Sequence, residues 1–181
     1  MALLVISTSL DPSSRSRLLA RHAHERLRRA SPGTAMLDLA ECDPPLPMCD
    51  ATSAYEHPSV AGVKRQIAGA SGVLLALPVY NFAAGATAKN LIELTGDAWE
   101  GKVVGIAAAA GGPNAFMAPM SIAMCLMLDF RCIVIPRFVY ATSEAFDAGA
   151  VTDDDVRRRL DQLADELARV SAAINHHPGG G

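Results

Sequence analysis

The sequence predicts an α/β fold in which a five-stranded parallel sheet lies between helices on both of its faces. Short apolar runs alternate along the chain with segments of helical periodicity, as in βαβ units. The 181 residues, of which 50% are hydrophobic and 19% charged, are enough for one compact domain with a sizeable core. We therefore expect a single domain over residues 1–175, followed by a flexible C-terminal tail at 176–181.

Five segments have the composition of buried strands. They are residues 2–7, 34–38, 72–77, 103–108 and 132–135. Short apolar runs of this kind are typical of parallel strands that are covered on both faces. Since open α/β sheets bind ligands at the carboxyl ends of their strands, the loops after these segments are the candidates for a binding site.

Two helices have clear signals in the sequence. Residues 14–30 combine an apolar face with arginines on the opposite face, which is the pattern of a helix packed on a sheet. That apolar face consists of Leu18, Leu19, Ala23, Leu27 and Ala30. For the last helix, Thr152 is predicted as the N-cap, and the three aspartates after it favour the positive end of the helix dipole. Its predicted buried face consists of Val156, Leu160, Leu163, Leu167 and Val170.

The loop after the first strand is rich in hydroxyl groups. Ser9, Ser14 and Ser16 occur there together with Arg15. Hydroxyls, a guanidinium and the free N–H groups of a first helical turn can all bind a phosphate monoester. The chain contains neither G-x-G-x-x-G nor G-x-x-x-x-G-K-[ST], so the two glycine-based phosphate loops are excluded. We predict a phosphate site that is made by serines.

The loop after the third strand points to a flat ring as ligand. It consists of Pro78, Val79, Tyr80 and Asn81. A buried strand that runs into such a loop presents backbone N–H and C=O groups at the sheet edge. After the fourth strand, Gly111 and Gly112 let the backbone approach a ligand closely, because no side chain intervenes.

With these motifs the chain resembles the flavodoxin-like NAD(P)H-dependent FMN reductases over roughly residues 3–146. The resemblance implies a flavodoxin-like three-layer fold. In that family a serine-rich loop holds the FMN phosphate, a Pro-x-Tyr-Asn loop holds the isoalloxazine ring, and a Gly-Gly loop closes the site. Carried over onto this chain, the expected cofactor-binding residues are Ser9, Ser14, Arg15, Ser16, Pro78, Val79, Tyr80, Asn81, Ala110, Gly111 and Gly112.

Two positions depart from the pattern of that family. Thr8 stands where the family usually has glycine, and Asp11 stands where it usually has arginine. Asp11 brings a carboxylate near the expected phosphate. Either Asp11 points to solvent and Arg15 supplies the positive charge, or the binding of FMN is weakened.

The resemblance implies an FMN-dependent NAD(P)H oxidoreductase, in which NADPH or NADH donates a hydride that passes through FMN to a small acceptor. Because the redox capacity belongs to the cofactor, the protein supplies position and dipoles, and no catalytic acid or base is required. The acceptor stays open among a free flavin, a quinone, an azo or nitro compound and an oxyanion. Two alternatives also stay open: a flavodoxin-type electron carrier, and a flavin-free interaction protein on the same fold.

Charge and composition restrict the partners. A net charge of −3 gives no reason to expect nucleic acid or an anionic membrane as a partner. No basic segment precedes the first apolar run, and we expect no apolar run to reach the about 18 residues that a membrane span needs. A cytoplasmic protein is therefore expected. The four cysteines show no C-x-x-C pairing, so we expect reduced thiols and no metal site.

Residues 116–128 are apolar around the whole circumference of a helix. A helix on the sheet of a monomer should have a polar side, so a subunit contact is favoured over a helix buried in the core. Leu91, Ile92 and Leu94 can join the same surface. The resemblance likewise implies a homodimer or homotetramer.

The longest irregular stretch, at residues 43–58, contains several prolines that exclude a regular helix across its first half. It is either a lid over the site or a plain surface crossover.

Overall fold

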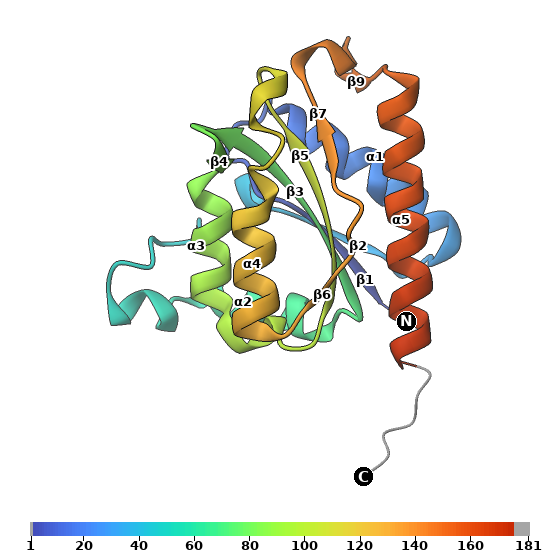
Figure 1. Ribbon diagram of the computed structural model, residues 1–181. Helices are drawn as coiled ribbons and strands as arrows, with labels where there is room; N and C mark the ends of the chain where they lie inside the picture. The colour runs from blue at the N-terminus through green and yellow to red at the C-terminus, as the bar shows by residue number, and fades with distance from the viewer. Residues whose placement is uncertain (1, 176–181) are drawn as a thin grey trace.

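A parallel sheet forms the centre of the computed structural model, which describes residues 2–175 (Figure 1). The strand order is β2-β1-β3-β5-β6, with β4 beside β3 and β7 beside β5. The strands are β1 (Leu3–Ser7), β2 (Ala35–Asp38), β3 (Gly72–Tyr80), β4 (Ala83–Ala84), β5 (Val103–Ala109), β6 (Ile133–Val134) and β7 (Val139–Ala141). A separate hairpin is formed by β8 (Phe146–Asp147) and β9 (Ala150–Val151). The predicted tail at 176–181 lies outside the described residues.

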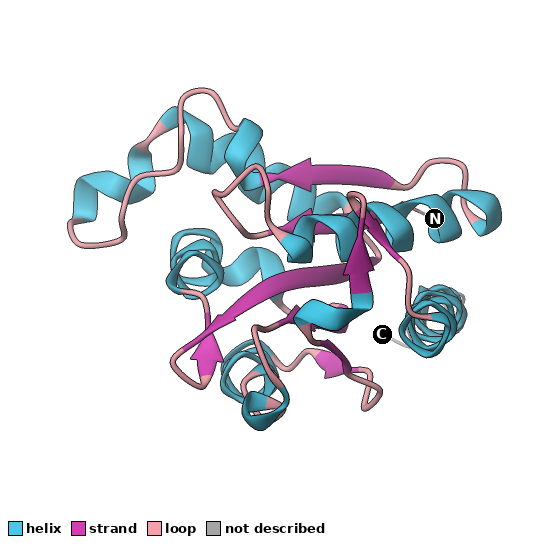
Figure 2. Cartoon of the chain, turned by 90° about the horizontal axis from the view of Figure 1, so that it is seen from above, coloured by secondary structure: helices cyan, strands magenta, loops and turns pink. Residues whose placement is uncertain are grey.

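Helices cover both faces of the sheet, as predicted. They are α1 (Arg15–Ala30), α2 (Pro58–Gly69), α3 (Ala86–Thr95), α4 (Pro119–Phe130) and α5 (Asp154–Asn175). One core cluster joins α1 and α5 to the sheet through side chains such as Leu19 and Leu163. The other joins α2, α3 and α4 to the opposite face through Ile67, Leu91 and Ile122. Figure 2 shows from above how the strands lie between these two helical layers.

The predicted fifth strand is divided in two. β6 pairs with the first half of β5, and β7 pairs with its second half. Between them, Ile135 still donates its N–H to Val104, at 2.8 Å, and Pro136 follows. Because proline has no N–H to donate to a ladder, regular pairing stops there and resumes at Val139. The strand predicted at residues 132–135 was therefore too short, and its second half was missed.

The helix starts follow the sequence with one correction. The helix α1 begins at Arg15 with Ser14 as its N-cap, one residue after the start predicted at residue 14. For α5, however, the N-cap is Asp153, whose Oδ1 accepts the N–H of Val156 at 2.8 Å. Thr152 instead donates its hydroxyl to the carbonyl of Ala145, at 3.4 Å. Aspartate and threonine are both good N-caps, so the sequence alone did not separate the two neighbours.

The irregular segment between β2 and α2 contains two 3-10 turns, Leu39–Glu41 and Thr52–Glu56. It is attached to α3 through Asn90, which lies under the segment. The amide of Asn90 donates to the carbonyl of Pro47, at 2.9 Å, and accepts the N–H of Cys49, at 2.8 Å. In Figure 1 the segment lies beside α2 and α3.

The start of β3 packs closely against α5, and a change there tests this packing. A Cβ added at Gly72 would lie 2.2 Å from Oγ of Ser171 and 3.2 Å from Cδ2 of Leu3. We expect Gly72→Ala to lower the free energy of unfolding by about 1–3 kcal/mol, as overpacked cores do, measured by urea denaturation. The matched control is Gly69→Ala at the end of α2, where a Cβ meets no atom within 4 Å. Equal stability of the two variants would contradict the close contact of α5 with β3.

Candidate functional site

A cavity of about 560 Å³ lies at the carboxyl ends of β1, β3 and β5. We call it the main cavity. It is lined by Asp11, Ser13, Ser14, Arg15, Ser16, Pro78, Val79, Tyr80, Asn81, Ala109, Ala110 and Gly111. The parallel register explains the convergence, because Ser7 pairs with Ala76 and Pro78 pairs with Ala109. The three loops therefore leave the sheet at its same edge.

Nine of the eleven residues expected from the sequence line the main cavity, and two lie elsewhere. Ser9 is buried, and its Oγ accepts the N–H of Asp11 at 3.2 Å. This hydrogen bond lies within the loop and helps to fix the backbone of the loop. Gly112 lines a side cavity of about 290 Å³, which shares Val79, Asn81, Ala110 and Gly111 with the main cavity. The side cavity is completed by Phe82, Asn114 and Ala115.

Hydroxyls gather at the start of α1 inside the main cavity. Oγ of Ser14 and Oγ of Ser16 lie 2.8 Å apart and share a hydrogen bond. Arg15, between them in sequence, is exposed. The first turn of α1 contributes the positive end of the helix dipole. This end of the cavity is suited to an anion.

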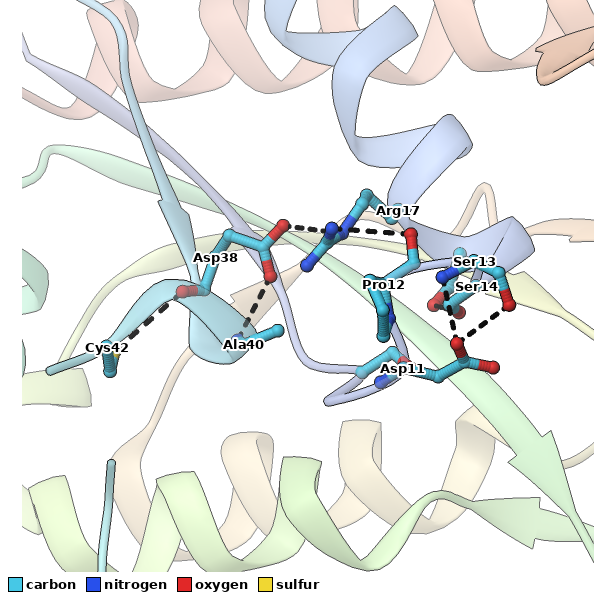
Figure 3. A network of polar contacts seen from close by, with 10 residues as sticks. Asp11, Pro12, Ser13, Ser14, Arg17, Asp38, Ala40 and Cys42 are labelled. Carbon is cyan, nitrogen blue, oxygen red and sulfur yellow. Dashed lines mark hydrogen bonds and ion pairs between the residues drawn. The ribbon is translucent and has the colours of Figure 1, made fainter. Parts of the chain in front are cut away.

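The side chain of Asp11 is hydrogen-bonded to another residue of the same loop (Figure 3). Its Oδ1 accepts the N–H of Ser13 at 2.8 Å and the hydroxyl of Ser13 at 2.7 Å. These two hydrogen bonds hold the pKa of the Asp11 carboxyl below its usual value, so the group is a carboxylate at neutral pH. The side chain lines the cavity and is also open to solvent.

A buried ion pair, which was not predicted from the sequence, holds the serine-rich loop. Nε of Arg17 lies 2.7 Å from Oδ2 of Asp38, and both side chains are less than one-tenth exposed. Nη1 of Arg17 also donates to the carbonyl of Pro12, at 3.3 Å, inside the loop. Oδ1 of Asp38 accepts the N–H of Ala40, at 3.1 Å. Arg17 therefore connects the loop to the end of β2, as Figure 3 shows.

A signal for this pair was present in the sequence. Asp38 ends a predicted buried strand, and Arg17 lies next to the apolar face of the first helix. A charge at either position requires a partner when it is buried.

Thr8 is the first departure from the family pattern, and its polar groups are hydrogen-bonded to the protein. Its N–H and its hydroxyl both donate to the carbonyl of Ala76, at 3.0 Å and 3.2 Å. Its own carbonyl accepts the hydroxyl of Thr87, at 2.5 Å, from the first turn of α3. The side chain is fully buried and leaves the cavity open.

The loop after β3 is a tight hairpin with an unusual backbone. Tyr80 pairs with Ala83, and the two residues between them, Asn81 and Phe82, have φ angles of 49° and 62°. Positive φ at both positions is typical of a type I′ turn. Asparagine tolerates it, whereas a phenylalanine in this region carries backbone strain. The turn leaves Phe82 71% exposed in the wall of the side cavity.

The diglycine loop after β5 is fixed through its carbonyl groups. The Tyr140 hydroxyl donates to the carbonyl of Gly112, at 2.5 Å, and the Ser143 hydroxyl donates to that of Gly111, at 3.1 Å. Both donors come from the segment that begins with β7. The carbonyls are thereby held by protein groups, and the position of this loop beside the main cavity is set by the missed second half of the fifth strand.

A second cavity of similar volume in the described part of the chain lacks the basic groups of an anion site. An edge cavity of about 510 Å³ lies between β2 and α2 and includes Asp38, Glu41, Cys42 and Asp43. No basic side chain is among the described residues that line it. Over residues 2–175, no group of three or more His, Cys, Asp or Glu side chains could hold a metal ion. Burial raises the pKa of Cys132 to about 11, so this thiol is protonated at neutral pH.

The irregular segment at residues 43–58 does not line the main cavity. Its residues Asp43, Pro44 and Pro58 line the edge cavity instead. His57 caps α2 through Nδ1, which accepts the N–H of Ser59 at 3.4 Å. In the arrangement described here, the segment is a surface crossover attached to α3.

Comparisons with known proteins agree with this geometry. The sequence model of a family described as NADPH-dependent FMN reductase matches residues 1–147. None of the curated proteins matches the chain in sequence.

Solved structures share the fold, which is the flavodoxin-like α/β fold. An oxidoreductase from Corynebacterium diphtheriae has a TM-score of 0.77 at 22% identity, covering 95% of this chain and 97% of its own. FerB, a flavoenzyme NAD(P)H:(acceptor) oxidoreductase from Paracoccus denitrificans, has a TM-score of 0.74 at 22% identity, covering 95% and 97%. The apo form of the NADH:FMN oxidoreductase EMOB has a TM-score of 0.77 at 17% identity, covering 93% and 89%.

The buried ion pair gives a stability prediction. We expect Asp38→Ala to lower the free energy of unfolding by about 3–5 kcal/mol, because Arg17 is left as a buried charge without its partner. Urea denaturation measures the loss. The double variant Arg17→Leu with Asp38→Leu is expected to recover most of it, since neither charge remains. A loss below about 1 kcal/mol for Asp38→Ala, typical of an exposed pair, would contradict the anchoring of the loop.

Proposed function

Since the chain belongs to the family of NADPH-dependent FMN reductases, and is an FMN-dependent NAD(P)H oxidoreductase, we propose that the main cavity is where it holds FMN. The observation that carries this proposal is the convergence of three loops, predicted separately from the sequence, on one cavity. The cavity volume of about 560 Å³ lies within the range of cofactor sites.

The serine end of the cavity suits the FMN phosphate. Ser14 and Ser16 line the cavity, and the exposed side chain of Arg15 lies at the same end. Ser16 is fully buried, and its hydroxyl supports that of Ser14 through their shared hydrogen bond. The first turn of α1 adds N–H groups and the helix dipole. These are the donors that a phosphate monoester requires.

The opposite end suits the isoalloxazine ring. Pro78, Val79 and Asn81 form one side, and Ala110 with Gly111 forms another. Most of these residues present backbone or small apolar groups, so a flat ring can approach closely. Tyr80, which is 59% exposed, stands at the edge of the cavity with its ring accessible for packing.

When bound, FMN supplies the redox chemistry by taking a hydride from NADPH or NADH and passing it to the acceptor. The residues of this chain then act by position. Ser14, Arg15 and Ser16 hold the phosphate, and the hairpin after β3 orients the ring. The side cavity beside Phe82 leaves open space next to the ring end. We propose that a flavin, a quinone or another small molecule is the acceptor.

Hydride exchange requires two rings in register, so both substrates must reach one face of the flavin in turn. The main and side cavities share Val79, Asn81, Ala110 and Gly111 in their walls and are therefore neighbours. This arrangement supports alternate binding of the nicotinamide and the acceptor next to the ring. The rival reading as an electron carrier needs a strongly acidic docking face, which a net charge of −3 does not favour.

We propose a homo-oligomer, a dimer or a tetramer, on the basis of an apolar patch on and around α4. The patch consists of Phe116, Met117, Met120, Met124, Met127, Leu128 and Ile133, each at least 39% exposed. The opposite side of α4 is buried against the sheet through Ile122, Ala123 and Leu126. Exposed large apolar side chains concentrated on and around one helix are typical of an interaction surface. Leu91, Ile92 and Leu94, which were expected to join the patch, are buried in the core instead.

A membrane is the other environment that could cover this patch. The stretch Pro113–Phe130 is apolar enough by length and composition to cross a membrane, with a mean hydropathy of 1.2, contrary to the expectation from the sequence. The regular helix α4 begins only at Pro119 and has 12 residues. At 1.5 Å per residue, such a helix is much shorter than the about 30 Å of a hydrocarbon core. We therefore propose a second copy of the chain as the occupant.

The remaining partners follow from the same chemistry. We propose that the protein acts on small molecules in the cytoplasm, without nucleic acid or membrane as a partner. All four cysteines are free, which fits a reducing compartment.

An anaerobic titration tests the proposed function. The purified protein, titrated with FMN in the absence of oxygen, is expected to change the absorption spectrum of the flavin, and this absorption is expected to disappear when NADPH or NADH is added. The spectrum reports binding, and its loss reports hydride transfer. A protein that neither takes up FMN nor oxidises either nicotinamide in its presence would contradict the assignment.

A variant of the loop serves as the control for this titration. Aspartate suits an N-cap position, so Ser14→Asp should leave α1 in place while it adds a negative charge at the proposed phosphate position, and FMN should bind about tenfold more weakly. Ser53→Asp, on an exposed 3-10 turn remote from the cavity, should bind FMN as the unchanged protein does. An equal loss of FMN affinity in both variants would show that the anion site is not at the start of α1.

The apolar patch predicts the oligomeric state. We expect sedimentation velocity to give a mass that is two or four times the 19.0 kDa of one chain. Met124→Glu places a charge in the centre of the patch and should shift the protein to monomers at micromolar concentration. Ile174→Glu, at a 40% exposed position of α5, is the matched control and should leave the mass unchanged. A monomeric unchanged protein would refute the homo-oligomer.

A further inference from the structure

Asp11 is a negative charge built into the anion end of the main cavity. Its side chain lines the cavity together with Ser14, Arg15 and Ser16. Figure 3 shows its carboxylate directed at Ser13, in the loop that Arg17 holds. An arriving phosphate therefore meets a carboxylate at the place where it needs donors.

The hydrogen bonds of this loop are mostly made within the loop itself. The N–H of Asp11 donates to Oγ of Ser9, and the N–H of Ser14 donates to the carbonyl of Asp11, at 3.1 Å. Asp11 itself takes both the N–H and the hydroxyl of Ser13. The carboxylate thus occupies donors that a bound anion would otherwise use, in the manner of an internal anion.

The formal charges of the loop also cancel. Arg15 supplies one positive charge and Asp11 one negative charge on the cavity wall. Arg17, the next cation along the chain, is buried and paired with Asp38. A phosphate monoester carries about −1.5 to −2 charges at neutral pH, so its attraction to this loop is much reduced.

We propose that Asp11 is a specificity-determining residue that makes the cavity discriminate little between FMN and riboflavin, so that the flavin exchanges readily with solution. The two flavins share the ring and the ribityl chain and differ in the phosphate. A loop whose charges cancel, and whose donors already have hydrogen-bond partners, gains little binding free energy from that phosphate. This inference rests on the proposed function, because it assumes that the main cavity binds a flavin.

The test compares the dissociation constants of FMN and riboflavin for the unchanged protein and for Asp11→Asn. Asparagine keeps an oxygen that can accept from Ser13, so the loop retains its shape while the charge is removed. FMN should bind Asp11→Asn about tenfold more tightly, from the loss of one like charge near the phosphate. The affinity for riboflavin should change less than about twofold, because no phosphate is present.

Salt provides a second readout on the same proteins. For Asp11→Asn, the attraction of FMN to Arg15 is no longer cancelled, so its affinity for FMN should fall as the salt concentration rises. For the unchanged protein, the affinity for FMN should depend only weakly on salt. A purely structural role of Asp11 would not alter this dependence.

Two control variants separate charge from loop shape. Asp11→Ala removes the charge and the hydrogen bonds to Ser13, and should change the affinities for both flavins. Asp129→Asn, an exposed position near the end of α4, removes a negative charge outside the cavity and should leave both affinities unchanged.

The outcomes are distinguishable. An unchanged ratio of FMN to riboflavin affinity in Asp11→Asn would overturn this inference and leave the proposed function standing. Strong preference of the unchanged protein for FMN over riboflavin would also overturn it. Binding of neither flavin to any of the proteins would overturn the inference together with the proposed function.

Discussion

The parallel pairing of β1, β3 and β5 is the constraint on which the site depends. Because the three strands run in one direction and in fixed register, Ser7 lies beside Ala76 and Pro78 beside Ala109, and their loops leave the sheet at one edge. Core clusters on both faces keep the strands in place. No single loop forms the main cavity. It exists because the buried sheet aligns three short segments that lie far apart in the sequence.

Two of these loops are held in place by groups outside the cavity. The ion pair of Arg17 with Asp38 holds the serine-rich loop, and Tyr140 and Ser143 hold the carbonyls of the diglycine loop. The first turn of α3 holds the carbonyl of Thr8. A site that binds a flavin through position and dipoles benefits from such support, since its groups are arranged before the ligand arrives.

The sequence predicted the parts of this arrangement that follow from local chemistry. Buried apolar runs predicted the strands, and hydroxyls before a helix predicted the anion loop that precedes α1. It missed what depends on distant contacts: Pro136 divides the fifth strand, and Asp38 meets Arg17 across about twenty residues of chain. Ser9 and Leu91 were expected at functional surfaces because they carry suitable side chains, yet both are buried. Burial of one side chain is decided by the whole fold, which a short motif does not specify.

A crystal structure of the protein grown with FMN tests the central claim most directly. We expect electron density for FMN in the main cavity, with its phosphate among Ser14, Arg15 and Ser16 and its ring between the hairpin after β3 and the diglycine loop. Density for the flavin in the edge cavity beside Asp38 and Glu41, or with its phosphate away from the start of α1, would contradict it.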